Sequence, residues 1–149
     1  MKLEDEIKQL KFKSVYAKLA VNISYTYFWV QDQLRQQLKV HQISLQQFNI
    51  LRILRGQHPK PATINLLKER MLDKSSDASR LVERLRKKGL IERLVCEEDR
   101  RSVNIVITEK GLELLTKLES IDEMHSRIFA ALSEKEAAEL SDLLDKLRG

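Results

Sequence analysis

Residues 75–111 constrain the fold most, because their apolar pattern changes from a helical period to a strand period and back again. Ala78, Leu81, Val82 and Leu85 recur at helical spacing and form one apolar face. The polar residues of the same segment then face mostly outward: Ser76, Ser79, Arg80, Glu83, Arg84 and Lys87. We therefore expect a helix that begins near residue 75 or 76 and ends at Gly89, with its arginines exposed.

Two short apolar segments follow this helix. Residues 90–96 and 103–107 are rich in β-branched side chains, which favour strands. The charged loop between them, residues 97–102, carries Arg100 and Arg101 at its tip. A polar helix face followed by an arginine-tipped hairpin is typical of a winged helix-turn-helix, in which the two parts fit different surfaces of duplex DNA.

The segment before this unit predicts a long first helix. Apolar residues recur every three or four positions from 15 to 38, namely Val15, Leu19, Ile23, Tyr27, Val30, Leu34 and Leu38. Six of the eight aromatic residues also fall here, namely Phe12, Tyr16, Tyr25, Tyr27, Phe28 and Trp29. A helix that is apolar on two faces indicates a partner subunit or a ligand pocket. The simpler alternative is that any one of these aromatics only packs the core.

Residues 44–89 predict three helices, and the last two of them form a helix-turn-helix. Ser44 and Gln47 form a capping box that opens a second helix, and the turn at residues 56–61 contains two prolines and a glycine. We expect a short third helix from about residue 62 to 71. A tight turn at residues 72–74 should then lead into the exposed helix described above.

The C-terminal segment predicts two further helices. Thr108 is the expected N-cap of a helix that runs to about residue 132, and Ser133 with Glu136 forms a capping box for a final helix. These helices are amphipathic and carry more apolar surface than a small winged domain can cover. Packing between subunits is the natural use of that surface.

Composition limits the classes of protein further. The net charge is +5, and acidic residues outnumber basic ones only in the C-terminal segment 111–149, which is therefore an unlikely nucleic-acid surface. No segment approaches the length of a membrane span, and the start of the chain does not resemble a signal peptide. With only one cysteine, Cys96, no intrachain disulfide can form, so a cytoplasmic location is expected.

Asp99, Arg101, Ile107, Thr108 and Gly111 reproduce the spacing of the wing signature of the MarR family of bacterial transcriptional regulators, with isoleucine in place of leucine. Residues 79–85 and 88–93 resemble the recognition-helix segment of that family, and the order of elements matches over essentially the whole chain. The resemblance implies a homodimer that places one recognition helix in the major groove and one wing in the minor groove per subunit. It also implies a small phenolic or aromatic effector bound between the dimerisation and DNA-binding parts.

The expected fold is therefore mainly α with a small β-hairpin wing, an α+β winged helix-turn-helix with long N- and C-terminal dimerisation helices. One domain spans residues 1–149. Within it, residues 1–40 and 111–149 form the dimerisation part and residues 44–110 the DNA-binding part. The expected function is sequence-specific repression of transcription from a pseudo-palindromic operator of double-stranded DNA. The alternative is a winged-helix module for protein–protein contact.

The expected DNA-binding residues lie on the exposed helix and the wing. They are Ser75, Ser76, Asp77, Ser79, Arg80, Arg84, Arg100 and Arg101, with Asp99 orienting the wing by holding Arg101 or a helical arginine. The serines suit phosphates at a helix N-terminus, whereas Arg80 suits the edge of a guanine. Asp77 has two interpretations: it accepts from a cytosine amino group, or it stabilises the helix N-terminus, and the second is preferred.

The candidate effector pocket is assigned to the aromatics of the first two helices, namely Tyr16, Tyr25, Phe28, Trp29 and Phe48. No catalytic constellation, cofactor motif or metal-ligand spacing is recognisable, and His41, His58 and His125 are far apart in the sequence. The chain is therefore not expected to be an enzyme or to carry a cofactor or metal. Cys96 is expected to be an ordinary strand residue, with a redox role as the alternative.

Overall fold

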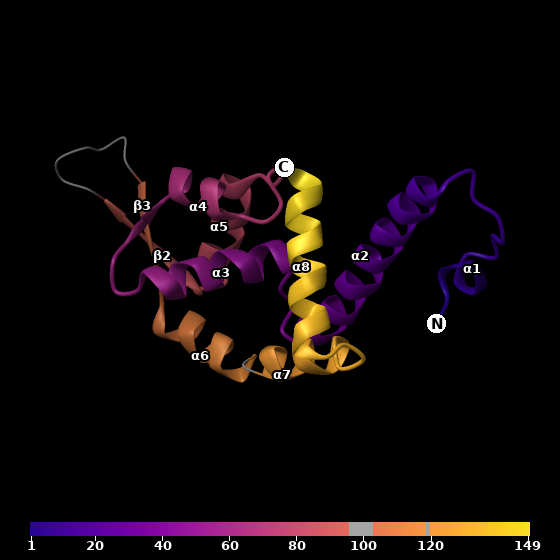
Figure 1. The fold of residues 1–149 in the computed structure, drawn as a ribbon. Coiled ribbons are helices and arrows are strands. Elements are labelled where there is room, and N and C mark those ends of the chain that lie inside the picture. Colours follow the sequence, from indigo (N-terminus) through magenta and orange to yellow (C-terminus); the bar gives the residue numbers. More distant parts are fainter. Residues whose placement is uncertain (96–102, 119) are drawn as a thin grey trace.

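The computed structural model describes residues 1–95, 103–118 and 120–149. Its elements, in chain order, are α1 (Leu3–Glu6), α2 (Val15–Lys39), α3 (Leu45–Gln57), β1 (Ala62–Thr63), α4 (Ile64–Arg70), α5 (Ala78–Lys87), β2 (Ile91–Val95), β3 (Val103–Ile107), α6 (Glu109–Lys117), α7 (Ser120–Ile128) and α8 (Glu134–Arg148). The β2–β3 hairpin lies at one end of the molecule and α1 at the other, with α8 upright between α2 and the winged part (Figure 1). In the part of the chain that the structure describes, no helix combines the length and the apolar character needed to span a membrane.

A single apolar core joins α3, α4, α5 and the sheet. Its most deeply buried side chains come from all of these elements, namely Ile50, Leu51, Leu54, Leu67, Val82, Leu85, Ile91 and Ile105. Complete burial of one such side chain contributes about 1.5–3 kcal/mol. The apolar face expected for α5 is confirmed at three positions, Ala78, Val82 and Leu85, while Leu81 is only partly buried.

The sheet has three antiparallel strands in the order β1-β3-β2. Ile91 pairs with Ile107 and Val95 with Val103, so the predicted hairpin is confirmed. The expectation that the third helix begins at residue 62 is wrong, because Ala62 and Thr63 form β1 beside β3. The hydroxyl of Thr63 then accepts from the backbone N–H of Leu66 at 3.1 Å, so α4 begins at Ile64.

Two further helix boundaries differ from the expected ones. The exposed helix begins at Ala78 rather than near residue 75, so α4 and α5 are separated by residues 71–77 instead of a turn of three or four residues. The single helix expected from Thr108 to about residue 132 is instead two helices, α6 and α7, because Leu118 leaves helical geometry with φ −93° and ψ 4°. The change of direction lets Leu118 and Met124 both pack on the core.

The long terminal helices are poorly covered within one chain. Only Leu38 is buried in α2, and α8 has no buried residue at all. Tyr16 is 79% exposed and Leu143 on α8 is 63% exposed. Phe12, expected within the first helix, lies before it, since Ser14 is the N-cap of α2. Both helices therefore present apolar surface that a single copy of the chain does not bury.

Gly111 allows α6 to approach the sheet closely. The hydroxyl of Thr108 accepts from the Gly111 N–H at 3.1 Å, which confirms Thr108 as the N-cap of α6. A Cβ atom at position 111 would lie 2.4 Å from the backbone oxygen of Leu90 and 2.6 Å from Cγ1 of Ile107. The first turn of α6 can occupy this position only if residue 111 has no side chain.

We expect Gly111→Ala to destabilise the fold by about 3 kcal/mol, because backbone atoms must move to admit one methyl group. Gly56→Ala is the matched control, since no atom lies within 4 Å of a Cβ at that helical position. There the same change should stabilise the protein by about 0.5–1 kcal/mol. Urea denaturation measures both; equal effects of the two substitutions would contradict the packing argument.

Candidate nucleic-acid interface

The first turn of α5 is organised by Asp77. Its carboxylate Oδ1 accepts from the backbone N–H of Arg80 at 3.1 Å, which makes Asp77 the N-cap of the helix. Because Ala78, Val82 and Leu85 are buried, Ser79 and Arg80 are turned outward and exposed. Arg84 follows Arg80 one turn later and is also exposed. The helix therefore offers a row of polar and basic side chains to solvent.

Ser75 and Ser76 precede α5 rather than opening it, so their expected place at the helix N-terminus is wrong. Ser75 bonds to Asp73 instead: its N–H and its hydroxyl donate to Oδ1 at 3.0 Å and 2.6 Å. The hydrogen bond from the Ser75 hydroxyl is the main cause that lowers the pKa of Asp73. Ser76 is half-buried. Both serines remain on the connection that leads into α5.

The other end of α5 is held by a group of contacts that the sequence alone did not reveal. Gly89 ends the helix with φ 71°, and its carbonyl accepts from the Thr108 hydroxyl at 2.7 Å. Lys110 Nζ donates to the carbonyl of Lys88 at 2.9 Å, and Lys88 Nζ donates to the carbonyl of Gln42. These bonds join the end of α5 to the start of α6 and to the α2–α3 connection. In the sequence, Lys88 beside the expected end of the helix is the one indication of a contact there.

The wing is described up to the ends of its strands. β2 and β3 pair along their whole length and extend away from the helices (Figure 1). The loop residues singled out from the sequence, Asp99, Arg100 and Arg101, lie outside the described residues, and so does Cys96.

A cavity of about 660 Å³ lies between α2, α3 and the connection that precedes α5. Its apolar wall is formed by Tyr27, Leu34, Leu45, Phe48 and Met71. Its polar lining includes Gln31, Arg35, Gln46, Asn49, Arg52, Asp73, Lys74, Ser75 and His125. The volume and the mixture of apolar wall with convergent polar groups are typical of small-molecule sites.

Of the five aromatics assigned to a pocket from the sequence, Phe48 lines this cavity and carries the Arg52 guanidinium 5.7 Å from its ring centroid. The other four, Tyr16, Tyr25, Phe28 and Trp29, do not line it. Tyr25 instead donates its hydroxyl to Glu6 of α1 at 2.8 Å, and this bond raises the pKa of Tyr25. Tyr27 takes their place on the cavity wall; the apolar stripe of the first helix already contained it.

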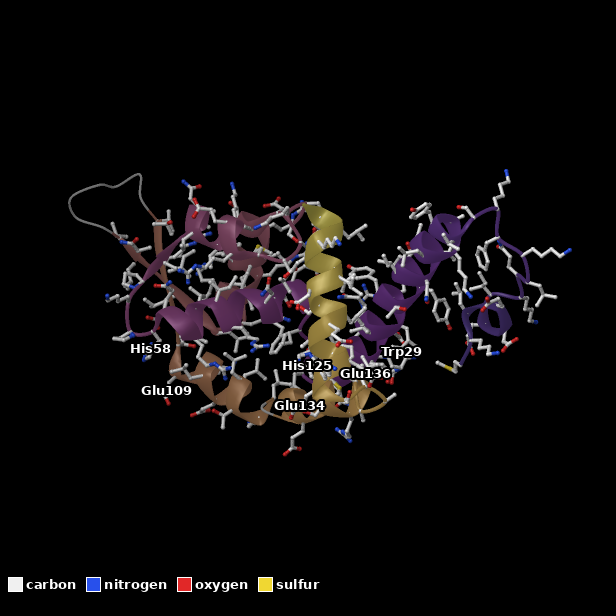
Figure 2. All side chains as sticks on the ribbon, viewed as in Figure 1. Trp29, His58, Glu109, His125, Glu134 and Glu136 are labelled. Atoms are coloured by element: carbon white, nitrogen blue, oxygen red, sulfur yellow. The ribbon has the colours of Figure 1, made fainter. Side chains whose placement is uncertain are left out.

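The histidines lie on different segments of the structure: His41 on the α2–α3 connection, His58 at the C-terminal end of α3 and His125 on α7. In Figure 2, His58 and His125 lie apart, and Trp29 lies on α2. Across residues 1–95, 103–118 and 120–149, no cluster of three or more histidine, cysteine, aspartate or glutamate side chains is placed to hold a metal ion.

Comparison with known proteins identifies the family. Residues 41–102 match the family model described as MarR family. The regulator PecS of Dickeya dadantii (strain 3937), an HTH-type transcriptional regulator, is 33% identical over 111 residues, which cover 72% of this chain and 66% of PecS. The chain thus spans slightly less than two thirds of that regulator.

Three crystal structures extend the similarity over most of the chain. A MarR transcription factor from Planctomyces limnophilus is 30% identical, with a TM-score of 0.70 over 91% of this chain and 98% of its own. The organohalide-sensing regulator RdhR in its 2,4-dichlorophenol-bound form is 26% identical, with a TM-score of 0.81 over 96% and 83%. The S. aureus MepR–DNA complex is 25% identical, with a TM-score of 0.77 over 90% and 96%.

The exposed row on α5, the β2–β3 wing and these matches lead to one conclusion: the chain belongs to the MarR family of winged helix-turn-helix, DNA-binding transcriptional regulators.

Proposed function

We propose that this regulator is a homodimeric repressor that binds a pseudo-palindromic operator and releases it when a small apolar or aromatic effector binds. The observation that carries the proposal is the outward row of Ser79, Arg80 and Arg84 on α5, held rigidly by the buried face of the same helix. A rigid helix of this kind can present particular side chains to base edges in the major groove.

We assign the roles on α5 and its preceding connection from the structure, and those on the wing loop from the sequence. Arg80 and Ser79 read base edges, and Arg84 supports them on the same face of α5. Ser75, on the exposed connection before α5, contacts a phosphate. The Ser76 hydroxyl is buried and does not face a phosphate in this structure. On the wing, Arg100 and Arg101 reach the minor groove, and Asp99 orients them. In this division residues 44–110 bind DNA, while residues 1–40 and 111–149 form the dimer.

The dimer is supported by the surface that α2 and α8 leave uncovered. Val15, Tyr16 and Phe28 are exposed along α2, and Leu143 and Leu147 are exposed along α8. Burial of such apolar side chains against a second copy is favourable, and a two-fold axis would pair like surfaces. A dimer of this kind carries two α5 helices, which explains why the operator should be nearly palindromic.

Selection from a library of randomised duplexes tests this function. We expect a palindrome whose half-sites lie about one helical turn apart. Arg80→Ala should flatten the preference at one position per half-site, because a bidentate arginine–guanine contact contributes about 1–3 kcal/mol of discrimination. Arg101→Ala should instead weaken binding to all sequences and lower the salt slope by about 1.

The two variants are titrated against a panel of operator variants at two salt concentrations. A reversed pattern, in which Arg101→Ala alters one base preference and Arg80→Ala alters only overall affinity, would show that the roles are exchanged. If the wild-type protein selects no sequence and its weak DNA binding does not depend on salt, the protein–protein module becomes the better interpretation.

Asp77 acts on DNA indirectly, through the N-cap that it supplies to α5. Asp77→Ala should destabilise the protein by about 1 kcal/mol in urea denaturation, because the Arg80 N–H loses its partner. Asp77→Ser keeps a capping oxygen and should restore both stability and operator preference. If Asp77→Ser is stable but changes the base selected at one position, Asp77 reads a base directly.

The cavity supports control by an effector. Its wall joins α2 and α3 to residues 71–75, which lead into α5. Asn49, on this wall, accepts from the backbone N–H of Leu72 at 3.0 Å. A molecule that fills the cavity therefore contacts the segment that positions the recognition helix. It causes release only if it binds the DNA-incompetent form more tightly.

Thermal-shift measurements with 2,4-dichlorophenol and other small phenols, with and without operator, test this control. A ligand at one hundred times its dissociation constant stabilises the free protein by about 2.7 kcal/mol, and the stabilisation should shrink when operator is bound. Phe48→Ala should weaken the response, because Phe48 lines the cavity. Phe12→Ala is the control, since Phe12 lies outside it. Binding that leaves operator affinity unchanged would contradict an effector role.

A further inference from the structure

We propose that Glu83 is a specificity-determining residue, which weakens the contacts of Arg86 and Arg93 with DNA phosphates and ties the recognition helix to the wing strand. The inference rests on DNA binding through α5. It concerns a carboxylate on a helix whose other charged residues are mostly basic.

Glu83 bonds to two arginines from different elements. Arg86, on α5, donates to it through Nε at 3.1 Å and through Nη2 at 2.8 Å. Arg93, on β2, places its Nη2 at 3.1 Å from the Oε2 of Glu83. The Glu83 carboxylate therefore bonds to both guanidinium groups and bridges α5 to strand β2 of the wing.

The sheet register explains why Arg93 reaches the helix. Arg93 pairs with Ile105, which is fully buried, so its side chain leaves β2 on the face that α5 covers. Glu92, the preceding residue, leaves β2 on the opposite face. The Arg93–Glu83 contact thus depends on the tertiary placement of α5 against β2.

The bridge is a poor source of folding stability. The three side chains are 33–46% exposed, and ion pairs at this exposure contribute little to folding. The hydrogen bond from Arg86, followed by the charges of Arg86 and Arg93, lowers the pKa of Glu83, which therefore stays ionised near neutral pH. A permanent negative charge beside two arginines acts mainly on what those arginines can bind.

DNA affinity that does not depend on sequence comes from arginines and lysines that contact phosphates. While they are bonded to Glu83, its carboxylate offsets the charge of Arg86 and Arg93 and takes up Nε and Nη2 of Arg86 and Nη2 of Arg93, which weakens any phosphate contact that they make. Arg80 and Arg84, by contrast, have no ion pair with any residue that the structure describes. Glu83 thus limits how strongly Arg86 and Arg93 contact DNA, and it adds one contact between α5 and β2.

The test uses Glu83→Gln, which has the same shape without the charge, and a mixed-sequence duplex of about 30 base pairs titrated over a series of salt concentrations. Each arginine that gains a phosphate contact should steepen the salt slope by about 0.9. At about 0.1 M salt this corresponds to roughly ten-fold tighter binding per contact. Discrimination between the selected operator and the mixed duplex should fall, and the melting temperature should change little.

Glu92→Gln is the matched control, because it removes the same charge from the neighbouring strand residue and Glu92 pairs with no described cation. It should leave the salt slope unchanged. The double variant Glu83→Gln with Arg93→Gln should lose the part of the steeper slope that Arg93 supplies. A purely structural role for Glu83 would lower the melting temperature without steepening the slope.

Equal salt slopes for Glu83→Gln and Glu92→Gln would overturn the inference while leaving DNA binding intact. No salt-dependent DNA binding by the wild-type protein would instead overturn the proposed function. If Glu83→Gln does not fold, Arg93→Gln and Arg84→Gln replace it. Arg93→Gln should weaken binding to the mixed duplex less than Arg84→Gln, because Arg93 is paired with Glu83 whereas Arg84 has no ion pair among the described residues. Equal losses would refute the bridge.

Discussion

The packing of one face of α5 on the core decides how this protein presents its polar residues. Ala78, Val82 and Leu85 are completely buried against α3, α4 and the sheet. A helix locked on one face has no freedom to rotate, so Ser79, Arg80 and Arg84 are turned outward as a consequence. The same packing brings β2 alongside α5, and with it the contact between Arg93 and Glu83. The buried face of α5 and its exposed polar row are thus fixed by one packing arrangement.

Fewer basic side chains near α5 are available to bind phosphates than the net charge of the chain indicates. The net charge of the chain is +5, but several basic groups near α5 are already engaged. Arg86 and Arg93 bond to Glu83. Lys110 bonds to the Lys88 carbonyl at the end of α5, and Lys88 bonds to the Gln42 carbonyl on the α2–α3 connection. Affinity for phosphates depends on the cations that remain available, so the arrangement of carboxylates and carbonyls matters as much as the number of arginines.

The cavity and α5 are joined by residues 71–75. Residues 71–75 line the cavity on one side and continue into α5 on the other, and Asn49 bonds to Leu72 within that segment. Since packed segments move between discrete positions rather than deforming continuously, a ligand on one side can bias the position of the helix on the other. The apolar faces of α2 and α8 are the other exposed surface of the chain, and contact with a second copy of the chain would bury their side chains.

Local patterns in the sequence determined the fold class and most of the boundaries. Ser44, Thr108 and Ser133 cap helices as expected, because a cap depends only on residues within one turn. The apolar period of α5, the hairpin and Gly89 are also local features, and each was predicted correctly.

The features that only the tertiary structure decided depend on contacts between residues far apart in the sequence. Ala62 and Thr63 are a strand only because β3 lies beside them, and α6 ends early so that Leu118 and Met124 can both reach the core. The cavity draws Tyr27, Phe48 and residues 71–75 together from separate segments, which a count of aromatics along one helix could not show. Periodicity reports which face of a helix is apolar, but only packing decides what that face meets.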